Sequence, residues 1–386
     1  MSLEQMQVWA SELPEQLRMA VERATARGWP SALQTDAFVT QTSFDEVGPD
    51  GTALGGSARG QAAPTFVGGM GGSAVSAKIS RSLLAPELTA PIEIGSDPLL
   101  PAWAGRSGPT GLISYSGQTW EVLALWEQLT ERGAIPWVVA SGGEIIERAC
   151  AAGAPHLIVP AGYAPRAAFG WLLSAVALAL AVPLGSAGID LTRKRLLQAA
   201  AGLAEERDLW ATGAANPGRS PAELARALAG KRVAFVVSRE SDLALAFRWK
   251  NQFEENAKQV AHVVLFPEAG HNEIEGWSRL REAALVYLET PPPPEESEGV
   301  ARSRSAALEA VVGIAADAGI GVQRVPANSG READRWTGFL SQILLADAVS
   351  LGIAEHLGID PEPVPVLSSV KDAVRRGTVG GRTSDL

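Results

Sequence analysis

Short apolar runs alternate with amphipathic stretches along the chain, and this alternation predicts the fold class. In the first half, strand-like runs occupy 64–67, 111–114, 135–140 and 156–159, and a helix-like stretch follows each of the first three. The second half repeats the pattern, with strands expected at 232–237, 260–266, 283–288 and 321–325 and helices at 242–258 and 302–318. Strands separated by helices are typical of α/β folds in which helices cover both faces of a parallel sheet.

The length of the chain predicts two such domains. It has 386 residues, about twice the usual length of one domain, and 46% of them are apolar, which is enough for two cores. A helical stretch at 190–209 and a loop-like stretch at 212–220 suggest that the boundary lies within 185–220. We place the first domain, which begins with a helix, at 1–195 and the second at 196–386.

One segment, 167–184, is apolar enough to resemble a membrane span, with Ser174 as its single polar residue. It is barely long enough to cross a bilayer, and its many alanines give it a weak transfer energy. We therefore predict a buried helix, ended by Pro183 and Gly185, in preference to a membrane span.

Composition narrows the classes of function. The formal net charge of −10 and the pI near 5.1 argue against a nucleic-acid partner, because the only basic clusters are the short runs 193–195 and 375–376. A single cysteine, Cys150, excludes an intramolecular disulfide framework and a cysteine-based zinc site. The four histidines show no metal-ligand spacing, so no metal is expected. The N-terminus lacks the pattern of a signal peptide, so we expect a cytoplasmic protein with no membrane partner.

Two loops have the composition of phosphate-binding loops. Residues 66–74 read FVGGMGGSA and follow a predicted strand, so backbone N–H groups of the next helix could hold an anion. Residues 113–121 read ISYSGQTWE and add hydroxyl groups around a glycine. Each loop alone is also compatible with a tight turn or with ordinary helix capping. At the carboxyl ends of parallel strands, however, two such loops form the kind of crevice that α/β sheets use for ligands.

The stretch 248–277 carries the strongest candidates for chemistry. Glu255 lies on the predicted helix 242–258, and His271 follows the predicted strand 260–266 after Pro267 and Gly270 interrupt it. The two residues need not meet within one subunit, because a partner chain could supply one of them. The alternative is a solvated helix carboxylate and a histidine that caps a turn.

Six motifs, in this order and spacing, resemble the bifunctional phosphoglucose/phosphomannose isomerases of the sugar isomerase (SIS) fold. They are GMGGSA (69–74), SYSGQT (114–119), PRAAFG (165–170), RWKNQFEENAK (248–258), HNEIEGW (271–277) and LGIDPEPVPVLSSVKDAV (357–374). The resemblance spans nearly the whole chain. It implies two SIS subdomains, each a parallel sheet flanked by helices, a C-terminal helix that returns to the active site, and a homodimer whose active sites lie between the subunits.

The resemblance also implies a role for particular residues, with hexose 6-phosphate as substrate and no cofactor. Matched motif by motif, Glu255 is the catalytic base, Arg166 stabilises the enediolate, and His271 of the other subunit and Lys371 of the C-terminal helix assist ring opening. The implied sugar-phosphate cradle consists of Gly71, Gly72, Ser73, Ser114, Ser116 and Thr119.

These residue types suit the chemistry that the family implies. Moving a carbonyl between C1 and C2 requires one base that removes a proton and returns it to the neighbouring carbon, and a carboxylate such as Glu255 can do both. A fixed guanidinium such as Arg166 stabilises the developing negative charge. Without the resemblance, Arg166 would be interpreted as a cap or a surface pair and Lys371 as a solvated lysine.

Two departures from the family pattern leave other functions open. Gln118 and Trp120 flank Thr119 where relatives carry Asn-Thr-Glu, and Gly95–Pro98 replaces a common Arg-Asp-aromatic motif. The leading hypothesis is an isomerase that interconverts glucose 6-phosphate and mannose 6-phosphate with fructose 6-phosphate. The alternatives are a SIS-fold binding or regulatory protein without activity, and an isomerase or epimerase for another sugar phosphate.

Overall fold

Two parallel β-sheets form the framework of the protein. The computed structural model describes residues 2–33, 63–279, 282–327 and 334–378. The first sheet has the strand order β2-β1-β3-β4-β5 and the second β7-β6-β8-β9, and every pairing is parallel. The strands are β1 (Thr65–Gly69), β2 (Ile92–Gly95), β3 (Thr110–Ser114), β4 (Trp137–Ala140), β5 (His156–Ile158), β6 (Arg232–Val237), β7 (Ala261–Leu265), β8 (Ala283–Leu288) and β9 (Gly321–Val325).

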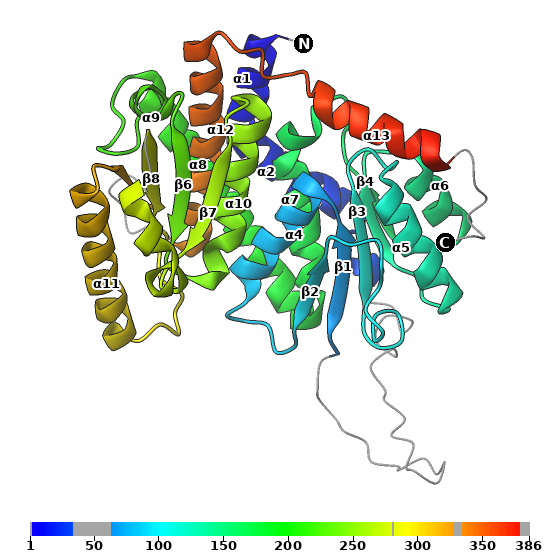
Figure 1. The fold of residues 1–386 in the computed structure, drawn as a ribbon. Helices are drawn as coiled ribbons and strands as arrows, with labels where there is room; N and C mark the ends of the chain where they lie inside the picture. The colour runs from blue at the N-terminus through cyan, green and yellow to red at the C-terminus, as the bar shows by residue number, and fades with distance from the viewer. Residues whose placement is uncertain (1, 34–62, 280–281, 328–333, 379–386) are drawn as a thin grey trace.

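Helices form a shared central layer and two outer layers (Figure 1). The central layer consists mainly of α2 (Leu13–Ala26), α4 (Gly71–Leu84), α7 (Phe169–Leu180), α8 (Gly185–Ala211), α10 (Leu243–Asn256) and α12 (Arg335–Leu357). The outer helices are α5 (Trp120–Glu131) and α6 (Glu144–Ala151) on the first sheet and α11 (Glu298–Asp317) on the second. The remaining helices are α1 (Leu3–Ser11), α9 (Pro221–Leu228) and α13 (Pro365–Thr378). Each sheet therefore has helices on both faces, as the sequence predicts.

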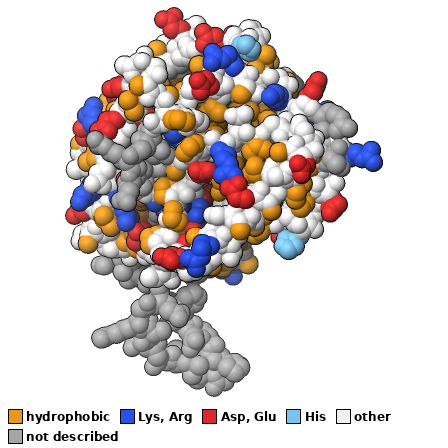
Figure 2. Space-filling view, turned by 90° about the vertical axis from the view of Figure 1, so that its left-hand side faces the viewer, with side chains coloured by type: hydrophobic (Ala, Val, Ile, Leu, Met, Phe, Trp, Pro, Cys, Tyr) orange, Lys and Arg blue, Asp and Glu red, His pale blue; other side chains and the backbone are white. Residues whose placement is uncertain are grey.

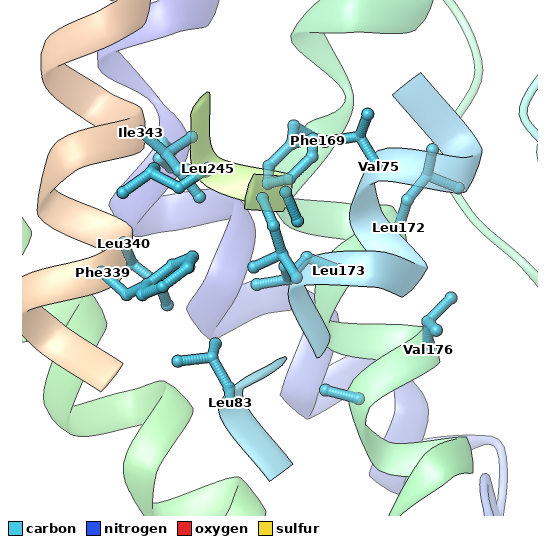
Figure 3. Close-up of a cluster of buried hydrophobic side chains, with 14 of the residues drawn as sticks. Val75, Leu83, Phe169, Leu172, Leu173, Val176, Leu245, Phe339, Leu340 and Ile343 are labelled. Carbon is cyan, nitrogen blue, oxygen red and sulfur yellow. The ribbon is translucent and has the colours of Figure 1, made fainter. Parts of the chain in front are cut away.

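One continuous core occupies the space between the sheets. All residues of α7 are buried, so the predicted buried helix within 167–184 is confirmed, and a short 3-10 turn at Val182–Leu184 follows it. Figure 3 shows side chains of α4, α7, α10 and α12 converging, with Phe169 beside Val75 and Leu173. The helix α12 is long and apolar enough to cross a bilayer, but 89% of the 18-residue apolar stretch that meets this criterion is buried inside the fold. It serves here as a core helix.

The predicted strands agree closely with the observed ones. Strands β6, β8 and β9 have the predicted bounds. Each of the other five predicted strands differs from its prediction by one or two residues at one or both ends. The strand β2, which has four residues and lies at the edge of the first sheet, was not predicted from the sequence. The predicted helix 190–209 is part of α8, which runs unbroken from Gly185 to Ala211. The domain boundary after residue 195 stays a prediction, although each sheet lies on one side of it.

The surface of the second half carries both signs of charge. On the face in Figure 2, acidic and basic side chains lie interspersed among apolar ones. Ion pairs at the surface of this half include Arg324 with Glu309 at 2.6 Å and Arg302 with Glu298 at 3.4 Å. Exposed pairs of this kind contribute little to stability, so the stability of the fold rests on its apolar cores.

A glycine permits tight packing between two central strands of the first sheet. Gly111 of β3 pairs with Trp137 of β4, and a Cβ atom on Gly111 would lie 2.2 Å from the buried indole. We expect Gly111→Ala to lower the free energy of unfolding by about 1–3 kcal/mol, the usual cost of overpacking a core. Urea denaturation measures this change. Gly321→Ala is the control, because a Cβ on this strand residue meets no atom within 4 Å, and a change within about 0.5 kcal/mol is expected. Equal stabilities of the two variants would contradict the packing argument.

Candidate functional site

The strand order of the first sheet reverses between β1 and β3, the position at which open α/β sheets form a ligand crevice. Strands β1 and β3 are neighbours, but β1 leads into α4 in the central helix layer and β3 leads into α5 on the opposite face. The two chain segments that leave these strands diverge, so the carboxyl edge opens between them. Such a switch point is where open α/β sheets bind ligands. Both predicted phosphate loops lie at this edge.

The first loop leaves open space in front of a helix N-terminus. Gly71 begins α4 with a left-handed φ of 51°, and a Cβ on Gly71 or Gly72 would meet no atom within 4 Å. N–H groups in the first turn of a helix have no partner within the helix and attract anions. The hydroxyl of Ser73 is buried and accepts a hydrogen bond from the Tyr115 N–H at 3.4 Å. Ser73 therefore joins the first loop to the second.

The second loop is shaped by its own hydroxyl groups. Ser114 Oγ and Thr119 Oγ1 are 2.8 Å apart, and the Gly117 N–H donates to Ser114 Oγ at 3.1 Å. Gly117 has a φ of 67°, and a Cβ there would lie 1.8 Å from the Gly142 carbonyl oxygen. The exposed Ser116 accepts the Gln118 N–H at 3.3 Å. Because Thr119 gives α5 no side-chain cap, the N–H groups that precede Val122 in the first turn of α5 are available to an anion, whereas the Val122 N–H donates to the Thr119 carbonyl at 3.0 Å.

Tyr115 connects this cradle to the segment that carries Arg166. Its hydroxyl donates to the Pro160 carbonyl at 3.1 Å and accepts the Tyr163 N–H at 3.1 Å. Its own carbonyl accepts the Ser141 hydroxyl at 2.6 Å. One side chain thus links the second loop to the connection after β5, which ends in the 3-10 turn Pro165–Ala167. The phosphate loops and Arg166 are therefore held in a fixed relation.

Arg166 is almost completely buried, and most of its donors are occupied by the protein. Its Nε donates to Asn256 Oδ1 at 2.6 Å, and its Nη2 donates to the Pro361 carbonyl at 2.6 Å. The remaining nitrogen, Nη1, lies 3.6 Å from Glu255 Oε2. Burial lowers the pKa of Arg166, and the charge of Glu255 opposes this shift. The guanidinium is thus fixed with one edge directed at the Glu255 carboxylate.

Glu255 lies at the boundary between this buried cluster and solvent. It occupies the last turn of α10, and its side chain is 30% exposed whereas that of Arg166 is 4% exposed. A carboxylate beside a fixed cation at a partly open position can be reached by a substrate and can exchange a proton with it. The structure therefore brings together the two residues that the sequence analysis named as base and as charge stabiliser.

A second layer of polar residues supports this pair. Arg248 Nη2 donates to both carboxylate oxygens of Asp347 at 2.8 Å and to the Arg166 carbonyl at 3.0 Å. The Arg248 guanidinium also lies 4.4 Å from the ring centre of Phe169. Asn256 Nδ2 donates to Ser350 Oγ at 3.0 Å. These contacts fix α10 and α12 to the turn that carries Arg166, and the sequence analysis assigned no role to these supporting residues.

Two further candidates are not brought to the Arg166–Glu255 pair. His271 ends the 3-10 turn Glu268–His271 after β7 and is exposed, and among the described residues no hydrogen bond or ion pair joins it to Glu255 or Arg166. Lys371 lies on α13, but its side chain is outside the part of the chain that the structure describes. Within the described ranges, no group of three or more His, Cys, Asp or Glu side chains could hold a metal ion.

The second sheet has its own cavity of about 510 Å³ near the ends of β6 and β7, but both arginines that line it are already paired with carboxylates. Arg239 Nη2 donates to Glu296 at 2.6 Å, and Arg304 Nε donates to the other oxygen of the same carboxylate at 2.8 Å. The Glu296 carboxylate occupies the position that an anionic ligand would need. The crevice of the first sheet, with its open helix N-termini, is therefore better suited to a phosphate group.

Comparisons with known proteins agree with this geometry. Residues 219–374 match the family described as the bacterial phospho-glucose isomerase C-terminal SIS domain. A bifunctional phosphoglucose/phosphomannose isomerase of Aquifex aeolicus is 30% identical over 312 residues, which cover 80% of this chain and 89% of the relative. A D-glucosamine-6-phosphate 4-epimerase of Sulfolobus acidocaldarius is 31% identical over 167 residues, 43% of this chain and 50% of that protein.

Among solved structures, a hypothetical protein of Thermus thermophilus superimposes with a TM-score of 0.65 and 16% identity, covering 97% of this chain and 91% of that one. At that identity the likeness shows a shared fold alone. The match with the Aquifex relative extends over most of both chains, and the name of that relative is the family that the six motifs predict. The chain therefore belongs to the bifunctional phosphoglucose/phosphomannose isomerase family.

Proposed function

We propose that the protein interconverts glucose 6-phosphate and mannose 6-phosphate with fructose 6-phosphate through a cis-enediolate. The observation that carries this proposal is the pairing of Glu255 Oε2 with Nη1 of the buried Arg166 at 3.6 Å. A pure binding protein has no need for a partly exposed carboxylate beside a fixed guanidinium. Membership of the isomerase family supports the same reaction.

The phosphate group would bind at the crevice of the first sheet. Supporting features are the open space before Gly71 and Gly72 and the uncapped N-terminus of α5 beside Thr119. Helix N-termini favour anions through free N–H groups and the helix dipole, so no lysine is required there. The hydroxyl pair of Ser114 and Thr119 and the exposed Ser116 add further hydrogen-bonding groups. The sugar would then extend from this cradle toward Glu255.

Proton transfer would be the task of Glu255. The carboxylate removes the proton from C2 of the aldose and returns it to C1, while O2 loses its hydroxyl proton and O1 gains one, and the reverse sequence converts the ketose. Negative charge develops on the sugar oxygens in the enediolate, and Arg166 Nη1 is the donor available to stabilise it. A guanidinium that is fixed beforehand in a water-poor position stabilises such charge without reorganising during the reaction. The contacts of Arg166 with Asn256 and Pro361 supply that fixation.

Ring opening would require residues that a second subunit and the C-terminal helix supply. We propose a homodimer in which His271 of one subunit reaches the Glu255 site of the other, and in which Lys371 assists proton exchange between the ring oxygen and O1. The exposure of His271, and the absence of a hydrogen bond or ion pair between it and Arg166 or Glu255 among the described residues, support an intersubunit arrangement. Imidazole exchanges protons readily near neutral pH. The proposed reaction uses no cofactor.

A coupled assay tests this function directly. Purified protein is given glucose 6-phosphate or mannose 6-phosphate in the presence of EDTA, and fructose 6-phosphate is measured. The proposal predicts turnover of both aldoses. If neither reacts and both protect the protein against thermal unfolding, a SIS-fold binding protein is the better account. If neither aldose reacts but glucosamine 6-phosphate, supplied separately and followed by chromatography of the sugar phosphates, is converted, the partial likeness to the Sulfolobus epimerase gains weight.

Removal of the proposed base should abolish most of the turnover. In Glu255→Gln the side chain keeps its size but cannot accept the proton from C2, so kcat should fall by roughly two to four orders of magnitude. The affinity for a hexose 6-phosphate should change little, as measured by thermal shift. Glu254→Gln is the matched control, since Glu254 pairs with Lys250 at 2.6 Å at the surface of the same helix. Near-normal turnover in Glu255→Gln would remove Glu255 from this role.

Complementation between inactive subunits tests the shared site. Equal amounts of His271→Ala and Glu255→Gln subunits are unfolded, mixed and refolded together. Each heterodimer then contains one site with both natural residues, so about one quarter of the wild-type activity should return for random pairing in a twofold dimer. The fraction of heterodimers is measured with one tagged subunit. Absence of rescue despite confirmed heterodimers would show that each site is built within one chain.

A further inference from the structure

The helix α13 is joined to the fold through a short connection that meets the candidate site. The helix α12 ends at Gly358, which has a left-handed φ of 66°, and the connection runs from there to Pro365. Along α13 the apolar residues Val366, Leu367 and Val370 are 75%, 48% and 58% exposed. Because these three side chains are not packed into a core, the connection that precedes α13 contributes to the position of the helix.

One buried carbonyl in this connection accepts two cationic donors. The Pro361 carbonyl accepts Arg166 Nη2 at 2.6 Å and Lys258 Nζ at 3.1 Å. Arg166 Nη2 also donates to the Glu362 carbonyl at 3.4 Å. A carbonyl oxygen has two lone pairs, so it can satisfy both donors. The connection is thus bound directly to the residue that faces Glu255.

Lys258 reaches this carbonyl from the end of the helix that carries Glu255. It follows the C-terminus of α10 and has a φ of 52°, a left-handed conformation that is uncommon for a residue with a side chain. Its Nζ also donates to the Glu255 carbonyl. Burial and the charge of Arg166 lower the pKa of Lys258, as expected for two cations that share one acceptor. The ammonium group is partly buried against the Pro361 carbonyl, but the residue as a whole is exposed, so hydrophobic packing does not account for this placement.

We propose that Lys258 is a positioning residue that fastens the connection 358–364 to the Arg166–Glu255 pair and thereby holds α13 over the active site. The inference deepens the proposed function, because α13 carries Lys371. Lys258 itself does not touch the reacting atoms. It acts through two carbonyl groups, one on the catalytic helix α10 and one on the connection. Loss of its ammonium group should leave the core intact and loosen α13 alone.

The test compares Lys258→Met with Lys250→Met in the full-length protein. Both variants keep the aliphatic stem and lose the charge, but the hydrogen bond of Lys250 joins it to Glu254 within α10 and not to the connection. Hydrogen exchange of peptides covering 358–378 should become at least about tenfold faster in Lys258→Met, the size of change that loss of a charged hydrogen bond produces. The same peptides should exchange at the wild-type rate in Lys250→Met, and peptides of α7 should be unchanged in both.

Kinetics provide the second readout. In Lys258→Met, kcat should fall by about tenfold or more while KM changes by less than about threefold, because misplacement of a catalytic element affects turnover more than binding. Lys258→Arg retains a charged donor and should restore both exchange and turnover to within about threefold of wild type.

Unchanged exchange at 358–378 in Lys258→Met would overturn the inference, as would accelerated exchange with unaltered kcat. A failure of the proposed function would look different. The wild-type protein would then show no isomerase activity, and the exchange comparison would still decide whether Lys258 holds the C-terminal segment.

Discussion

A buried guanidinium must find partners for its donors, and the arrangement around the site follows from how Arg166 meets this requirement. Its Nε and Nη2 bond to Asn256 of α10 and to the carbonyl of Pro361 in the connection that leads to α13. Burying a charge without partners would be costly, so these contacts are strongly constrained. They leave Nη1 as the edge that faces Glu255. Three segments far apart in sequence are thereby held at one point.

The shared central layer of helices explains how that point can be rigid. The helices α7, α10 and α12 belong to one continuous core, and Phe169 of α7 lies both in this core and against the Arg248 guanidinium. Arg248 in turn binds Asp347 of α12. Side chains in a close-packed interior cannot shift independently of their neighbours. Precise placement of Glu255 is therefore a consequence of the packing between the two sheets.

The sequence predicts most of the strands because parallel strands in such folds are continuous apolar runs between turn-forming residues. The strand β2 was missed because it is short, lies at a sheet edge and has Glu93 exposed in its centre. The helix α12 was not predicted because nearly every position along it is buried, so it has no polar face to reveal its period. Local patterns of apolar and polar residues do not detect elements of either kind.

The sequence predicted those residues of the candidate site whose interaction partners lie on the same chain. Glu255 and Arg166 were identified through family motifs, and the structure places them together. The cradle role of Ser73 stays a prediction, and the structure adds that its hydroxyl accepts the Tyr115 N–H and so joins the two loops. The supporting contacts of Asn256, Asp347 and Lys258 depend on long-range packing that periodicity does not encode. The approach of His271 from a second subunit is a proposal, and a pattern within one chain cannot establish it.

The most direct measurement of the central claim compares two ligands on wild-type protein and Arg166→Gln. One ligand is a hydroxamate analogue of the cis-enediolate, and the other is a hexitol 6-phosphate, which cannot be enolised. If Arg166 acts on the charge that develops during the reaction, the variant should lose about 10²–10³-fold in affinity for the analogue and less than about tenfold for the hexitol phosphate. Thermal unfolding confirms that both proteins are folded. Equal losses for the two ligands would contradict the account, because Arg166 would then serve only to bind the sugar phosphate.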